Sequence, residues 1–92
     1  MSKNNSYFKV ITVDGYAFPT DPQAVFDFNS QGFMFLNRGP YTIEYSFDGS
    51  TLHGDLKATD VSKDRIFESR CECKAWFRAK DGYGDVRVEA WR

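Results

Sequence analysis

The last third of the chain alternates between apolar and polar residues, and this rhythm restricts the fold more than any other feature. Residues 71–79 place five small or apolar side chains on one side: Cys71, Cys73, Ala75, Phe77 and Ala79. Residues 85–91 do the same with Val86, Val88 and Ala90. Successive side chains of a strand point to opposite faces of a sheet, so each run predicts a strand with one buried and one exposed face.

The segment between these runs predicts that they form a β-hairpin. Residues 80–84 include Gly82 and Gly84, which are typical of a short turn between paired strands. Pairing Ala79 with Gly84 sets Phe77 opposite Val86 on the inner side. On the outer side, this register pairs Arg78 with Asp85, Trp76 with Arg87, and Lys74 with Glu89. Each such pair contributes roughly 0.2–1 kcal/mol.

The rest of the chain carries further short strand patterns separated by turn residues. We expect strands over residues 6–13, 23–28, 33–36, 41–47, 51–56 and 65–69, with turns at 14–15, 29–32, 37–40 and 48–50. A helix capped by Asp21 is the weaker alternative for residues 21–28. Seven or eight strands predict an all-β fold, a small antiparallel β-sandwich of jelly-roll or immunoglobulin-like type, with a small β-barrel as the second choice. Residues 6–92 form this single domain, and residues 1–5 form a flexible arm.

Composition narrows the functional classes. The chain has 12 Lys and Arg against 13 Asp and Glu, a balance that argues against non-specific binding to nucleic acid or anionic membrane. No apolar run is long enough for a membrane span, and the polar N-terminus does not resemble a signal peptide. We expect a protein made inside the cell.

No residue constellation in the sequence indicates catalysis or a bound metal or cofactor. The only histidine, His53, lies beside a predicted hairpin and has no recognisable catalytic partner. Cys71 and Cys73 are predicted to be small buried residues. A metal site would require two more ligands, and an intermolecular disulfide is the alternative if their face is less buried. We therefore expect no enzyme activity, no cofactor and no metal.

The two tryptophans are the most informative polar-face residues. By parity, Trp76 and Trp91 lie on the exposed side of the predicted hairpin, near Arg78 and Arg87. Rings in this setting cover a sheet edge or form a protein contact, and a sugar-binding platform is a third reading. Residues 33–36 are apolar on both faces, which predicts a central strand or one covered by another subunit. The candidate interface residues are Trp76, Trp91, Arg78, Arg87, Phe33 and Phe35.

Residues 36–49 join an Asn-Arg-Gly-Pro turn to the strand and turn Ile43-Glu44-Tyr45-Ser46-Phe47-Asp48-Gly49. With Cys73–Arg78 and Val86–Trp91, this segment resembles the small β-sandwich structural proteins of tailed-bacteriophage virions, found on the capsid surface or at the neck or collar. The resemblance covers about residues 33–92 and rests on strand and turn patterns.

The resemblance implies a non-enzymatic component of the virion, made in the host cytoplasm and present in many symmetric copies. It implies contacts with other virion proteins in the capsid, neck or tail, and assembly as a homo-oligomer, without nucleic acid or membrane partners. A carbohydrate- or receptor-binding β-sandwich is the alternative function, and a small enzyme is the least favoured.

Overall fold

The computed structural model describes residues 6–26, 31–57, 64–67, 72–79 and 82–91, and these residues contain strands and no helix. The strands are β1 (Ser6–Val13), β2 (Ala24–Val25), β3 (Gly32–Pro40), β4 (Ile43–Ser46), β5 (Gly54–Leu56), β6 (Asp64–Phe67), β7 (Lys74–Ala79) and β8 (Gly84–Trp91). The all-β prediction is confirmed, and the helix considered for residues 21–28 is absent from its described part, residues 21–26.

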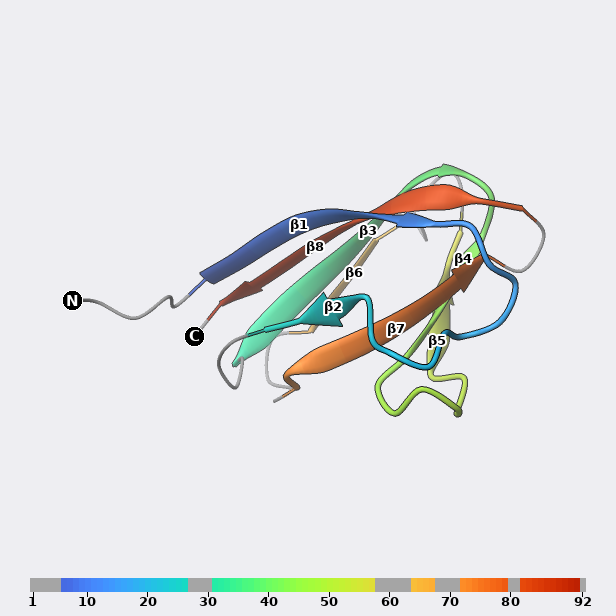
Figure 1. The fold of residues 1–92 in the computed structure, drawn as a ribbon. Coiled ribbons are helices and arrows are strands. Elements are labelled where there is room, and N and C mark those ends of the chain that lie inside the picture. Colours follow the sequence, from blue (N-terminus) through green and yellow to red (C-terminus); the bar gives the residue numbers. More distant parts are fainter. Residues whose placement is uncertain (1–5, 27–30, 58–63, 68–71, 80–81, 92) are drawn as a thin grey trace.

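The strands form two four-stranded antiparallel sheets packed as a sandwich (Figure 1). The first sheet has the order β1-β8-β3-β6, and the second has the order β2-β7-β4-β5. Consecutive strands alternate between the sheets at every step except from β4 to β5. Among the described strands, β4 and β5 are therefore the one sequential pair that forms a hairpin, around the predicted turn at Asp48–Ser50.

The predicted hairpin of β7 and β8 is wrong, because the two strands belong to different sheets. Phe77 lies opposite Tyr45 of β4, whereas Val86 lies between Ile11 of β1 and Asn37 of β3. None of the predicted pairs, Arg78–Asp85, Trp76–Arg87 or Lys74–Glu89, forms. Both sides of β8 are already occupied by β1 and β3, so β7 cannot pair with it. The chain instead passes from one layer to the other.

The buried faces of β7 and β8 are nevertheless those that the alternation predicts. Ala75, Phe77 and Ala79 of β7 and Val86, Val88 and Ala90 of β8 all lie in the core. Phe35 lies in the aromatic part of this core, with its ring centroid 4.9 Å from that of Phe77 and 5.3 Å from that of Tyr45. Because such rings bury large apolar areas, contacts across the two layers hold the sandwich together.

The segment at residues 37–40 is part of β3 rather than the predicted turn. The pairing of β3 with β8 shifts register between Asn37 and Pro40, and Gly39 has φ 80°, a conformation that favours glycine. The buried Asn37 side chain donates from Nδ2 to the carbonyl oxygens of Tyr41 (2.7 Å) and Leu56 (3.0 Å) and accepts the Gly39 N–H at 2.7 Å. Asn37 thereby ties β3 of the first sheet to β5 of the second.

Two further expectations concern the N-terminus and the cysteines. The expected flexible arm, residues 1–5, and Cys71 lie outside the described residues. Cys73 is exposed, so its predicted burial is wrong. It immediately precedes β7, and its carbonyl oxygen accepts the Phe26 N–H at 2.8 Å. The buried alternation begins only at Ala75.

Candidate functional site

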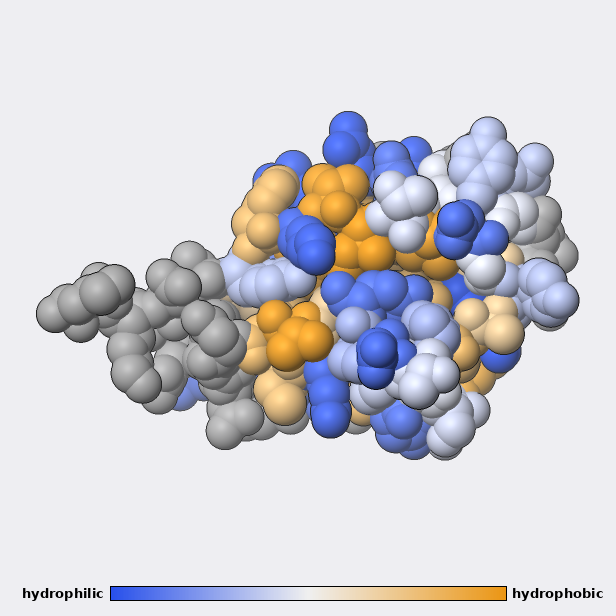
Figure 2. Space-filling view, viewed as in Figure 1, coloured by the Kyte–Doolittle hydropathy of each residue, from blue (hydrophilic) through white to orange (hydrophobic). Residues whose placement is uncertain are grey.

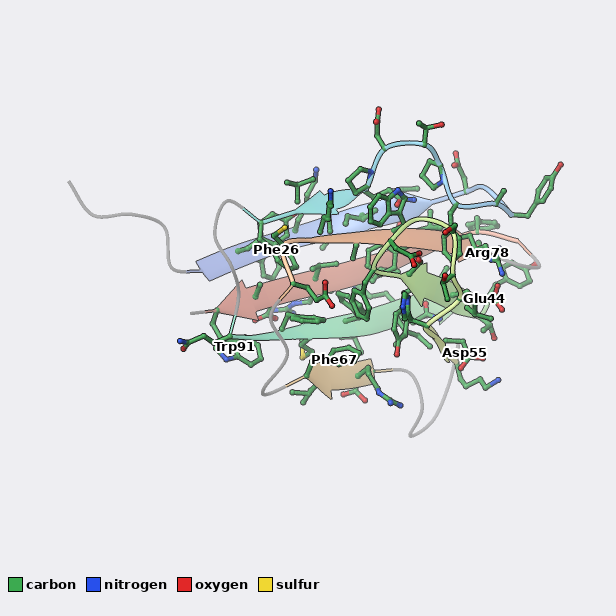
Figure 3. All side chains as sticks on the ribbon, turned by 90° about the horizontal axis from the view of Figure 1, so that it is seen from below. Phe26, Glu44, Asp55, Phe67, Arg78 and Trp91 are labelled. Carbon is green, nitrogen blue, oxygen red and sulfur yellow. The ribbon has the colours of Figure 1, made fainter. Side chains whose placement is uncertain are left out.

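The six predicted interface residues do not form one cluster. Trp76 and Arg78 belong to β7 in the second sheet, whereas Trp91 and Arg87 belong to β8 in the first. Figure 3 shows Arg78 near one end of the sandwich and Trp91 near the other. The structure therefore separates these side chains into two surfaces, one on the outer face of each sheet.

Trp76 is not exposed, as its parity suggested, because loops of the same chain cover it. It points to the outer face of the second sheet but is only 7% exposed. Its Nε1 donates to the Thr20 carbonyl oxygen at 3.4 Å, and its ring lies against the backbone of Gly49, where a Cβ atom would lie 2.9 Å from it. Two segments, around residues 14–23 and 47–53, thus close over this tryptophan. It is unavailable as a sugar-binding platform.

Arg78 lies beside Trp76 on the same face and is held within the chain. Its Nε lies 2.6 Å from Oε1 of Glu44, its cross-strand neighbour in β4. Its guanidinium carbon lies 4.4 Å from the centroid of the Phe18 ring. Glu44 is only 6% exposed, so this charge is shielded from solvent and paired. A buried carboxylate requires such a partner, and Arg78 has a structural role here.

Phe33 and Phe35 lie in the core and not on an accessible surface. Both are fully buried, and they are flanked on both sides by β8 and β6. The same strand turns Met34 and Leu36 to the outer face of the first sheet, where both are half-buried. The run at residues 33–36 is thus a central strand with an apolar outer face. The accessible apolar residues are Met34 and Leu36 rather than the phenylalanines.

The outer face of the first sheet carries the largest gathering of uncovered apolar side chains among the described residues. Phe8 is 58% exposed, Ile66 is 56% exposed and Trp91 is 39% exposed. With the half-buried Met34 and Leu36 and the exposed Val10, they define what we term the apolar face: Phe8, Val10, Met34, Leu36, Ile66 and Trp91. Figure 2 views the edge of the sandwich at β1 and β2 and shows hydrophobic surface over β1.

Strand pairing fixes the positions of these side chains. Trp91 lies opposite Gly32, and its ring covers this glycine so closely that a Cβ atom there would lie 2.6 Å from it. Phe8 lies opposite Glu89, and Met34 lies between Glu89 and Ile66. Cross-strand neighbours share a face, so the apolar face is a rigid property of the sheet and not of a loop.

A single ion pair lies at the centre of the apolar face. Arg87 Nε lies 2.8 Å from Glu89 Oε2, in an ion pair without an aligned hydrogen bond. The Arg87 guanidinium carbon also lies 4.5 Å from the centroid of the Phe8 ring. Both charged side chains are partly exposed. They stand between apolar neighbours on β1 and β3, so a protein partner docking here would meet one positive and one negative charge surrounded by apolar groups.

A small cavity lies between the end of β1 and the loop that follows it. It has a volume of about 230 Å³ and is lined by Thr12, Asp14, Gly15, Ala17, Pro19, Gln23 and Phe77. The Gln23 amide pairs with the backbone of Phe77, donating to its carbonyl oxygen at 2.7 Å and accepting its N–H at 2.9 Å. Gln23 therefore extends the β2–β7 pairing with a side chain, and its polar atoms are occupied.

Two titratable side chains in the loop between β4 and β5, His53 and Asp48, hydrogen-bond to the backbone of that loop. His53 Nδ1 accepts the Phe47 N–H at 3.0 Å and closes the loop between β4 and β5. The backbone N–H groups of Thr51 and Ser50 hold the pKa of Asp48 well below its usual range. No group of three or more His, Cys, Asp or Glu side chains among the described residues is placed to hold a metal ion. No described helix has the length and apolar character that crossing a membrane requires.

The fold and surfaces define the class as a small two-layer antiparallel β-sandwich with one apolar outer face. Comparison with protein-family models, curated proteins and solved structures found no significant match for this chain.

Sequence reasoning missed five of the six residues of the apolar face: Phe8, Val10, Met34, Leu36 and Ile66. The signal was present in β1, where Phe8 and Val10 alternate with Ile11 and Val13, but both sets are apolar. A strand with two apolar sets gives no indication of which one is buried. Only the packing of Ile11 and Val13 into the core shows that Phe8 and Val10 point outward.

Proposed function

We propose that this protein is a non-enzymatic structural component of a bacteriophage virion that acts through protein–protein contacts. The observation that carries the proposal is the apolar face of the first sheet, which no described residue of the chain covers. Contiguous exposed apolar surface of this kind marks protein interaction sites, because leaving it in water is unfavourable. The resemblance of residues 33–92 to small virion sandwich proteins supplies the biological setting.

Two features of the molecule support an assembly role. The apolar face lies on a sheet fixed by the long strands β1, β3 and β8, so a partner binds without a large ordering cost. The Arg87–Glu89 pair gives this surface polar groups that restrict the orientation of a partner. The proposal covers a capsid-surface, neck or fibre-anchoring position, each of which requires a docking surface of this kind.

Of the two tryptophans considered for a carbohydrate-binding role, only Trp91 is accessible. Trp76 is buried, and the Trp91 ring packs over Gly32, which has no polar side chain to offer a sugar. An aromatic platform selects a sugar only with convergent polar groups around it. The observations therefore favour the protein contact.

Mass spectrometry of purified phage particles tests the proposal. We expect the full chain to be a stoichiometric virion component and an Ile66→Lys variant to be incorporated at a much lower level. Val25→Lys is the matched control, because Val25 on β2 has the same 56% exposure but lies on the second sheet. Absence of the wild-type chain from particles, or equal loss of both variants, would contradict the proposal.

A further inference from the structure

The apolar face is a regular array whose charges alternate in sign along β8. Its two central rows follow from the register and are Phe8–Glu89–Met34–Ile66 and Val10–Arg87–Leu36–Asp64. In each row, one charged residue of β8 is flanked by an apolar residue of β1 and one of β3. The two rows carry opposite charges at their β8 positions.

This arrangement is complementary to itself. Consider a second copy placed face to face and related by a two-fold axis that lies in the interface, perpendicular to the strands. The operation exchanges the two rows, so Glu89 of one copy faces Arg87 of the other, and the reverse contact forms at the same time. The β1 and β3 residues of the two copies meet as apolar columns, Phe8 against Val10 and Met34 against Leu36.

We propose that the apolar face binds a second copy of this chain, forming a two-fold symmetric dimer in which the Arg87–Glu89 pairs of both copies join into one alternating network. The network keeps the Arg87 and Glu89 charges paired when water is excluded, which is the condition for burying ions at an interface. Asp64 of β6, the edge strand of this sheet, lies opposite Ile66 of the other copy. This inference rests on the proposed assembly role, because it names the partner of the same surface.

The sheet edges are not the association surface, since both edges of the first sheet carry a charge on the core-facing side. In β1, Lys9 occupies a core-facing position between Tyr7 and Ile11 but is exposed. In β6, Arg65 occupies the equivalent position opposite Phe35, also exposed. Such charges prevent a further strand from extending the sheet. Association through the face avoids both.

The face is also large enough for a stable contact. Three strands of eight or nine residues and one of four, spaced about 4.8 Å apart, cover a projected area of about 450 Å². An interface of ordinary size covers about 800 Å² of accessible surface on each partner. The accessible area of a layer of projecting side chains exceeds its projection, so the whole face approaches this size.

Charge exchange tests the geometry directly. Sedimentation velocity and native mass spectrometry should find the wild-type 92-residue chain as a dimer. Glu89→Arg gives a face with two arginines and Arg87→Glu gives one with two glutamates, so each variant alone places like charges opposite one another. We expect each change to weaken its own dimer at least about 100-fold.

Mixing the two charge variants should restore dimerisation. The two-arginine face of Glu89→Arg meets the two-glutamate face of Arg87→Glu, so both cross-copy contacts become favourable again. The heterodimer should form with an affinity within about 10-fold of the wild type. Restoration upon mixing cannot result from refolding of either variant, and circular dichroism of each variant alone confirms its fold.

Phe8→Lys and Val25→Lys extend the test to the apolar part. Phe8 faces Val10 of the other copy, so Phe8→Lys should shift the protein to monomer, and the similarly exposed Val25→Lys on the other sheet should leave the dimer unchanged. The inference is overturned if the mixture stays monomeric, or if Val25→Lys abolishes the dimer while Phe8→Lys does not. A wild-type chain that is monomeric at about 1 mM but present in virions would also overturn it, and would leave the proposed function standing.

Discussion

The two sheets differ in what covers their outer faces. The outer face of the second sheet carries Arg78, Glu44 and Trp76, and loops of the same chain lie over it and contribute Phe18, Thr20 and Gly49. The outer face of the first sheet carries apolar side chains, and no described loop packs over them. The chain thus covers one face of the sandwich with its own loops, and the described residues leave the other face uncovered.

This contrast shows that one residue type can have opposite roles on the two faces. Each face has a tryptophan and an Arg–Glu pair. Trp76 and Glu44 are buried by the chain and Arg78 is half-buried, whereas Trp91 and both members of the Arg87–Glu89 pair are more exposed. Matched substitutions should therefore destabilise the monomer on one face and affect association on the other.

The tryptophans give the largest expected difference. Trp76→Ala removes a ring packed beneath Thr20 and Gly49, so we expect the free energy of unfolding to fall by about 3–5 kcal/mol. Trp91→Ala removes a ring that is 39% exposed, and we expect a loss below about 1.5 kcal/mol. Urea unfolding at low protein concentration measures both values without a contribution from association.

A larger loss for Trp91→Ala than for Trp76→Ala would contradict the comparison between the two sheets. It would mean that the tryptophan of the first sheet is the covered one. Trp76→Phe is the matched control, since it keeps an aromatic ring beneath the loops but removes the hydrogen bond to Thr20 and part of the indole. We expect the free energy of unfolding of this variant to fall by about 1 kcal/mol, far less than that of Trp76→Ala.

The two Arg–Glu pairs sharpen the comparison with a smaller effect. Arg78→Ala leaves the Glu44 carboxylate buried without its 2.6 Å partner, so we expect a loss of about 2–3 kcal/mol in the free energy of unfolding. Arg87→Ala breaks a pair whose side chains are both partly exposed, so the monomer should lose less than about 1 kcal/mol. We expect a double-mutant cycle of Arg78 and Glu44 to show a favourable coupling energy between the two side chains. A coupling energy of zero would contradict the structural role of this pair.

The alternation of residues predicted which sides of the strands are buried but not which strands are neighbours. Phe77 and Val86 face the core as expected, yet their strands lie in opposite layers. A glycine-containing connection with two alternating runs fits a hairpin within one sheet and a crossing between two sheets equally well. Segments distant in the sequence decide between these two arrangements, because β1 and β3 pair with both sides of β8 and leave no edge for β7.

Only part of the candidate site was predicted, because residue alternation gives no information about contacts between distant segments. Parity correctly placed Trp91 and Arg87 on an outer face, and it also placed Trp76 there, but parity contains no information about loops that fold over a face. In residues 33–36, both residue sets are apolar, so the sequence did not distinguish the buried Phe33 and Phe35 from the outward Met34 and Leu36. Burial of one apolar set rather than another is decided by packing between the sheets.

The turn after β4 gives the smallest expected effect, a pH dependence of the covered face. Asp48 Oδ1 accepts the N–H groups of Thr51 (2.7 Å) and Ser50 (2.9 Å), and these bonds hold the pKa of Asp48 well below its usual value. The folded state therefore binds fewer protons at this carboxyl than the unfolded state. The resulting stabilisation is present above about pH 4 and is lost progressively as the pH falls below it.

Asp48→Asn isolates this contribution, because the amide oxygen still accepts hydrogen bonds but carries no charge. We expect the difference in free energy of unfolding between wild type and Asp48→Asn to favour the wild type near neutral pH and to shrink as the pH is lowered from about 4. This turn includes Gly49, which lies against Trp76, so Trp76 fluorescence should report its loosening. A difference that stays constant with pH would mean that the charge of Asp48 does not hold the covering loop in place.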